Sequence, residues 1–199
     1  MAIVTTSSVQ QVIQGLPERA QLVAAGGQSY GAQINAANAF TMLITIPTTR
    51  AELALQNGEV GGGKSYIIDR VWCKAVTSMA SAESGVILAQ CIAPGTALVA
   101  DSANKTIYSL SCKPKYGGKA QFAVASTSVG ALTDAWDHLH TINSAINATT
   151  NIAALFSAEC YGRYIIPPQG TFAMNFQESV SGGTGIIGVE WHEVQLTLG

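Results

Sequence analysis

Four titratable side chains that could bind a metal or exchange a proton lie close together in the chain: Asp134, Asp137, His138 and His140. Carboxylates and imidazoles are ligands for zinc and other transition metals. On a helix, Asp134 and His138 share a face, whereas His140 points elsewhere. Two ligands do not make a tight metal site, so an exposed polar face beside Trp136 is the simpler interpretation and we predict no bound metal.

A second histidine with acidic neighbours is His192, between Glu190 and Glu193. On a strand, alternate side chains share a face, so Glu190 would lie beside the imidazole. We expect no nucleophile there for the imidazole to activate. The chain has no HExxH motif. We expect no GxSxG nucleophile elbow, no P-loop and no GxGxxG followed by a helix, because the glycine clusters lie between predicted strands, where turns need them. The 12 acidic residues give no sign of a glycosidase pair. We therefore predict no enzymatic activity and no cofactor.

The elements that would position these residues are predicted to be strands. Apolar and polar residues alternate in many short segments that end at Gly, Pro or Asn. The predicted strands cover 40–46, the two sides of the turn between Leu53 and Cys73, and 86–92, 106–112, 121–126, 153–161, 164–166, 172–176 and 187–191. The last two are predicted to pair as a hairpin. The pattern predicts an all-β protein, a jelly-roll-like β-sandwich of two sheets.

Two segments depart from this pattern. Residues 129–152 carry apolar residues at spacings of three and four, which predicts a short helical insertion between strands. Residues 1–38 have too few apolar residues for a core and are predicted to form an extended or partly helical N-terminal arm, with the sandwich domain at 39–199. Four apolar residues could pin this arm to a neighbouring subunit: Val12, Ile13, Leu16 and Leu22.

Composition argues against several functions. Charged residues are 11% of the 199 residues, against about 25% in an average soluble domain. Such a weakly hydrated surface is suited to burial in subunit contacts, so we predict a homo-oligomer. The net charge of −2 argues against nucleic acid or a membrane as partner, and no apolar run is long enough to span one. The N-terminus does not resemble a signal peptide, which indicates synthesis in the cytoplasm.

A local basic cluster is the exception. Lys105, Lys113, Lys115 and Lys119 are interleaved with Tyr108 and Tyr116, and they could contact phosphate or an acidic partner. The simpler interpretation is an edge strand whose lysines discourage pairing with other sheets. The four cysteines (Cys73, Cys91, Cys112 and Cys160) have no metal-ligand spacing and read as small buried thiols, although one or two disulfides stay open.

Two motifs resemble virion structural proteins of tailed bacteriophages. One is IPTTRAELALQNGEVGGGKSYIIDRV, from Ile46 to Val71, which reads as a hairpin. The other is IIPPQGTFAMNF followed by GTGIIGVEWHEVQL near the C-terminus. The resemblance implies a jelly-roll-like sandwich that forms symmetric oligomers, often trimers, on the outside of a particle. It implies a decoration, cement or fibre-base protein that is located in the virion and stabilises the particle by contacts with capsid or tail proteins.

An alternative function is the trimeric head of a phage fibre that binds a host receptor or glycan. Loops at one end of the sandwich would then carry the contacts. The side chains expected to contact a partner or receptor are Tyr108, Lys113, Lys115, Tyr116 and Trp136. A third hypothesis, an enzyme that acts on surface polymers, would require Asp134 or Asp137 to be essential for activity.

Overall fold

The computed structural model describes eleven segments of the chain. These are residues 29–34, 39–41, 45–46, 48–76, 85–93, 105–110, 116, 118–128, 136–142, 155–178 and 183–196. They contain strands and no helix: β1 (Ser29–Ile34), β2 (Phe40–Thr41), β3 (Arg50–Gln56), β4 (Ser65–Ala75), β5 (Gly85–Ile92), β6 (Lys105–Ser109), β7 (Gln121–Ser128), β8 (Asp137–Ile142), β9 (Leu155–Glu159), β10 (Ile165–Ile166), β11 (Thr171–Glu178) and β12 (Thr184–Val194). The all-β prediction is confirmed for the described residues.

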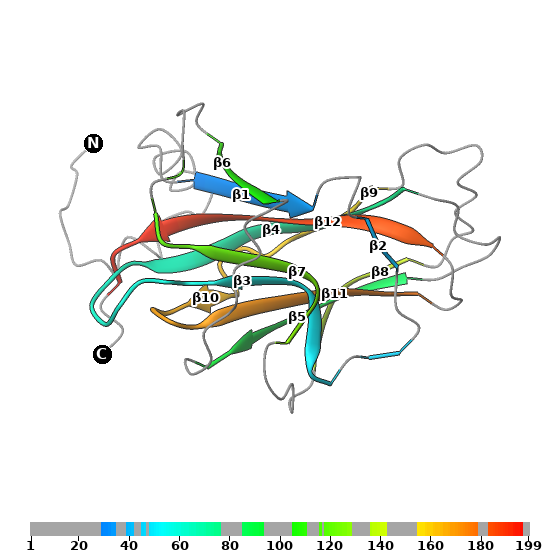
Figure 1. Ribbon diagram of the computed structural model, residues 1–199, viewed down its shortest axis with the longest axis horizontal. Coiled ribbons are helices and arrows are strands. Elements are labelled where there is room, and N and C mark those ends of the chain that lie inside the picture. Colours follow the sequence, from blue (N-terminus) through cyan, green and yellow to red (C-terminus); the bar gives the residue numbers. More distant parts are fainter. Residues whose placement is uncertain are drawn as a thin grey trace.

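The strands form two antiparallel sheets, one above the other in Figure 1. Sheet A has the strand order β10-β4-β12-β1-β6, with β2 paired to β12 and β9 paired to β4. Sheet B has the order β7-β3-β11-β5-β8. The result is a β-sandwich-like arrangement in which β12 is a long central strand of sheet A and β11 is the central strand of sheet B.

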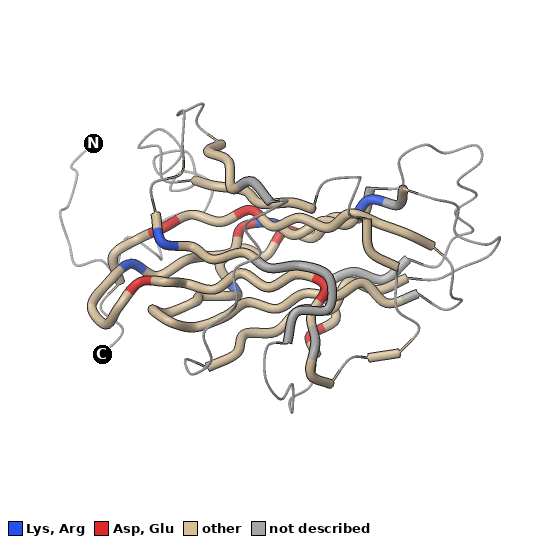
Figure 2. Tube along the Cα trace, in the orientation of Figure 1, with Lys and Arg blue, Asp and Glu red and all other residues tan. Residues whose placement is uncertain are grey.

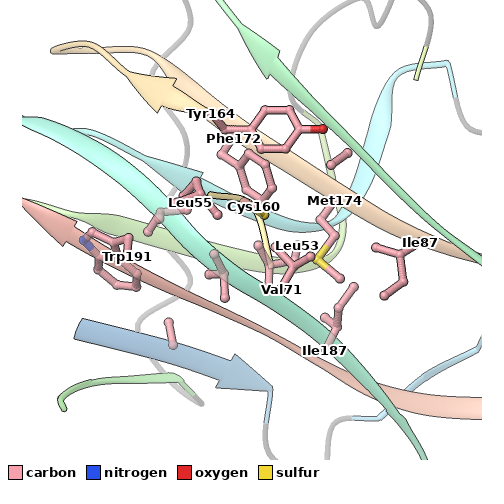
Figure 3. Packing of buried hydrophobic residues seen from close by; sticks show 14 of the residues in the cluster. Leu53, Leu55, Val71, Ile87, Cys160, Tyr164, Phe172, Met174, Ile187 and Trp191 are labelled. Carbon is pink, nitrogen blue, oxygen red and sulfur yellow. The ribbon is translucent and has the colours of Figure 1, made fainter. Parts of the chain in front are cut away.

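The core lies between the two inner faces (Figure 3). Sheet B contributes alternate residues of β3 and β11, including Leu53, Leu55 and Phe172, and sheet A contributes alternate residues of β12, including Ile187 and Trp191. All five are fully buried. The period of two in 172–176 and 187–191 therefore predicted the core faces of β11 and β12 correctly.

Two predicted hairpins are wrong, because the strands on either side of each loop belong to different sheets. β11 lies in sheet B and β12 in sheet A, so 172–176 and 187–191 face each other across the core and do not pair. In the same way, the loop after β3 carries the chain from sheet B to β4 in sheet A. Local alternation cannot separate these cases, because a strand buries one face whether its neighbour in sequence pairs with it or packs against it.

The predicted helical insertion is also wrong over Asp137–Ile142, which form strand β8 at the edge of sheet B. β8 pairs with β5, and a bulge between Ile87 and Leu88 shifts the register. The backbone hydrogen bonds of that pairing override a helical spacing of only a few apolar residues. The other residues of 129–152, apart from Trp136, lie outside the described residues.

The range predicted for the N-terminal arm, residues 1–38, includes strand β1 of sheet A. Strand β1 lies between β12 and β6 in sheet A, so the two-sheet domain already includes Ser29. Val12, Ile13, Leu16 and Leu22 lie outside the described residues. Among the residues that the structure describes, no helix has the length and apolar character needed to cross a membrane.

Candidate functional site

The three aromatic residues predicted to contact a partner lie in three separate places. Tyr108 lies on the outer face of sheet A, over the backbone of Gly31: a Cβ built on that glycine would be 2.6 Å from the tyrosine ring. Trp136 is buried in a small cluster with Ala54 and Leu88, on the outer face of sheet B. Tyr116 packs against the core between the sheets. The structure therefore does not bring them onto one surface, and Lys113 and Lys115 lie outside the described residues.

The hydroxyl of Tyr116 is already used within the chain. It donates to Glu193 Oε1 at 2.7 Å and accepts from the backbone N–H of Ala120 at 2.8 Å. Lys64 Nζ lies 3.3 Å from the other oxygen of Glu193, whose side chain is almost fully buried. Burial, together with the hydrogen bonds to Tyr66 and Glu193, raises the pKa of Tyr116 well above its ordinary value. This network joins the loop between β3 and β4 to the loop before β7.

A pocket of about 440 Å³ opens on the side of the molecule where strand β8 faces the turn that precedes β10. Its lining residues are Ala89, Gln90, Cys91, Asp137, Arg163, Tyr164 and Ile165. Asp137 Oδ1 accepts from Arg163 Nη2 at 2.9 Å, and Oδ2 accepts from the Tyr164 hydroxyl at 2.6 Å. Burial and that hydrogen bond raise the pKa of Tyr164. The carboxylate thus fixes the 160–164 turn against sheet B.

The cluster of Asp134, Asp137, His138 and His140 does not form a metal site within the described part of the chain. Asp137 is held by Arg163 and Tyr164, and His138 is exposed at the start of β8. Asp134 and the side chain of His140 lie outside the description. No group of three His, Cys, Asp or Glu side chains that could hold a metal occurs among the described residues.

Three cysteines are described, and none of them forms a disulfide. Cys73 and Cys160 are buried, as predicted, whereas Cys91 is exposed at the pocket. Burial raises the pKa of the Cys160 thiol to about 12, and partial burial of the Cys91 thiol raises its pKa to about 11. Both thiols are therefore protonated at neutral pH.

His192 has an acidic partner that the sequence pattern did not indicate. Its Nδ1 lies 2.8 Å from Asp69 Oδ1 and 2.9 Å from Asp69 Oδ2, while its buried Nε2 has no hydrogen-bond partner. Asp69 comes from β4, where a bulge faces the step between Glu190 and Trp191. The bulge places two successive residues, Asp69 and Arg70, between the core residues Ile68 and Val71, so both lie on the outer face.

Ser29 lies on the other side of His192. The two residues are directly paired between β1 and β12, and both are almost fully buried. Because β4, β12 and β1 are consecutive strands of sheet A, Asp69, His192 and Ser29 follow one another across its outer face. A serine is thus paired with His192 across the two strands, which the sequence pattern did not indicate. Residues 27–31 match the letters of GxSxG, and residues 58–65 match those of a P-loop, GxxxxGKS. Strand β1 begins at Ser29 and strand β4 begins at Ser65, so neither match has the helix that its motif requires, and neither is a signal for a site.

Comparison with known proteins gives no family for this chain. No family model, no curated protein and no solved structure matches it. The residues and their geometry are thus the basis for any functional proposal.

Proposed function

We propose that this protein is a structural protein of a virion, a homo-oligomer that decorates or cements the particle through contacts between weakly charged surfaces. A jelly-roll connection of the two sheets and a trimeric assembly are parts of this proposal. The observation that carries it is the neutralisation of charge within each subunit. The motifs between Ile46 and Val71 and near the C-terminus resemble bacteriophage virion proteins, and this resemblance is the reason why we propose a virion as the location.

Four described basic side chains each lie within 4 Å of a carboxylate of the same chain. Lys119 lies 3.2 Å from Glu59, and Arg163 lies 2.9 Å from Asp137. Arg70 is shared between Glu159 at 3.6 Å and Glu190 at 3.8 Å, and Lys64 pairs with Glu193 at 3.3 Å. Such partly exposed pairs add little stability, but they leave few unpaired charges on the described surface that need to stay hydrated. Figure 2 shows long uncharged stretches along both sheets.

The described surface also exposes several large apolar side chains. Val60, at the tip of the loop between β3 and β4, is 61% exposed, and Tyr161 is 73% exposed. Ile46, Val76 and Leu110 are exposed as well. Scattered apolar residues on a weakly charged surface lower the desolvation cost of association, because few hydrated groups must lose water.

The test is the molar mass in solution, measured by light scattering at several protein concentrations. The full chain and a chain that starts at Ser29 are compared, because β1, the first described strand of sheet A, begins at Ser29. We expect a stable oligomer of the full chain, and co-sedimentation of it with particles assembled without this protein. A monomer at every concentration that also fails to sediment with particles would contradict the proposal.

The alternative function, a receptor- or glycan-binding head, is favoured by one observation. The pocket with Asp137 and Arg163 combines hydrogen-bonding groups with the exposed ring of Tyr161 in the adjoining turn. Carboxylate, guanidinium and aromatic groups are suited to hydroxyl groups and to the apolar face of a sugar. A glycan array tests this function: binding that is lost in Tyr161→Asn but kept in Val60→Ser would support it, and an array without binding would reject it.

A further inference from the structure

We infer that Ser29, His192 and Asp69 form an acyl-transfer site on the outer face of sheet A, with Ser29 as the nucleophile and a small ester as the substrate class. This activity goes beyond the proposed structural role and does not depend on it. The argument rests on three observations: the hydrogen bonding of the histidine, the placement of the serine and the burial of both.

The histidine has the arrangement of a general base with an orienting acid. Both oxygens of Asp69 lie within 2.9 Å of Nδ1, so this nitrogen carries the proton and donates it to the carboxylate. Nε2 is then the basic nitrogen. It is buried without a hydrogen-bond partner, which is rare for a polar atom in a folded protein and calls for an explanation. Acceptance of a proton from a nucleophile is such an explanation.

The serine lies on the side of His192 opposite to Asp69. Directly paired residues of antiparallel strands point to the same face, with their Cβ atoms about 4.5–5.5 Å apart. The backbone carbonyl of Ser29 accepts from the N–H of Leu110 at 3.0 Å, which fixes the start of β1. Ser29 Oγ does not hydrogen-bond to Nε2 in this structure. Bonds between nucleophile and base are often longer without substrate, and rotation of the serine about χ1 moves the hydroxyl.

Burial limits the substrate. Ser29 is 6% exposed and His192 is 2% exposed, so a bulky acyl group would not reach both. Asp69 is 31% exposed and stays in contact with water. A short acyl chain on a good leaving group is therefore the substrate that the inference names.

The reaction balances with water as the only co-reactant. Ser29 Oγ attacks the carbonyl carbon, its proton passes to His192 Nε2, and the bond from the carbonyl carbon to the leaving oxygen breaks as that oxygen takes the proton. Water then attacks the acyl-serine and gives a proton to Nε2. The carboxylic acid leaves, and the proton returns to Ser29 Oγ. Asp69 remains a carboxylate and stabilises the imidazolium in both steps.

The experiment uses a small alkyl fluorophosphonate, which forms a bond between phosphorus and a nucleophilic serine oxygen and releases fluoride. The full chain is treated, its mass is measured, and the modified peptide is mapped. We expect one adduct, on Ser29, and release of p-nitrophenol from p-nitrophenyl acetate. Ser29→Ala should abolish both, and His192→Gln should slow labelling about 100-fold. Ser157→Ala, a substitution on the same face of sheet A, should leave both unchanged.

Labelling elsewhere, no labelling of the unsubstituted chain, or equal rates in His192→Gln would overturn the inference. The position of the adduct on the unsubstituted chain can overturn the inference by itself. The test therefore holds even if a variant fails to fold. Asp69→Glu keeps the carboxylate and should retain more activity than Asp69→Asn, which a purely structural role would not require. Oligomer mass is measured separately, so failure of this site leaves the virion proposal standing.

Discussion

At the scale of single residues, Asn57 holds together the connection that crosses from sheet B to sheet A. Its Nδ2 donates to the carbonyls of Lys64 and Ile166, at 2.7 and 3.0 Å, and its Oδ1 accepts from the N–H of Glu59. Its backbone exchanges two further hydrogen bonds with Gln169 and Gly170. One fully buried side chain therefore satisfies three backbone groups, two in the loop after β3 and one in strand β10.

We expect Asn57→Ala to lower the free energy of unfolding by about 3 kcal/mol, because it leaves buried backbone groups without partners. Urea denaturation measures this difference. Gln195→Ala is the control: this exposed side chain also bonds to the loop, at Gly62 O, and its loss should cost under about 1 kcal/mol. Equal effects of the two substitutions would show that Asn57 does not organise the crossing.

Glu52 is a buried carboxyl group on β3. Its backbone N–H donates to Asn175 Oδ1 at 2.7 Å. Burial raises the pKa of Glu52 from 4.5 to about 7. Between these two values the unfolded chain ionises Glu52 while the folded chain keeps it protonated. The folded state therefore loses stability as the pH rises from about 4.5 to about 7, by roughly 3 kcal/mol in all.

We expect Glu52→Gln to remove this loss. The variant should be more stable than the unsubstituted protein at pH 8, by up to roughly 3 kcal/mol, and similar to it at pH 4. Urea unfolding across this pH range measures both. Glu159→Gln, which removes an exposed carboxylate, is the control and should keep the pH dependence. A Glu52→Gln variant with the same pH dependence as the unsubstituted protein would contradict the assignment.

At the scale of elements, sheet A is shaped by aromatic rings that lie on glycines of the neighbouring strand. A Cβ built on Gly188 of β12 would lie 2.3 Å from the ring of Trp72 on β4, and Gly31 of β1 has the same relation to Tyr108 of β6. The two strand pairs are in direct register. These glycines are required for close approach of the rings to the backbone.

Gly188→Ala should lower the free energy of unfolding by about 1–3 kcal/mol, because the new methyl group displaces the buried indole of Trp72. Gly61→Ala is the matched control, since a Cβ at Gly61 meets no atom within 4 Å. Near-ultraviolet circular dichroism should report the moved indole in Gly188→Ala. An unchanged spectrum and unchanged stability would show that the ring has room to move.

At the scale of the whole molecule, internal pairing of charges predicts how the proposed oligomer responds to salt. If its contacts are made by weakly charged surfaces, ionic screening has little to weaken. We expect the mass from light scattering to be the same from about 0.1 M to about 1 M NaCl. Dissociation at the higher concentration would indicate that ion pairs between subunits hold the assembly together.

The sequence by itself determined the kind of secondary structure over most of the described chain and the faces that form the core. Alternation in 172–176 and 187–191 has a period of two, and that period is a local property of an extended backbone. Composition likewise indicated a weakly charged molecule, since charge is counted residue by residue. The helix predicted over 129–152 failed at β8 because backbone hydrogen bonds to β5 override the helical spacing of a few apolar residues.

Only the tertiary structure decided which strands pair. The pairing in turn decided which residues come together in the candidate sites. A loop such as that after β3 can join two paired strands or cross the core, and both bury the same alternate residues. Distant segments then set the register that places Asp69 and Ser29 on either side of His192. These three residues are far apart in the chain, so their geometry depends on long-range backbone hydrogen bonds and on a bulge that no local pattern specifies.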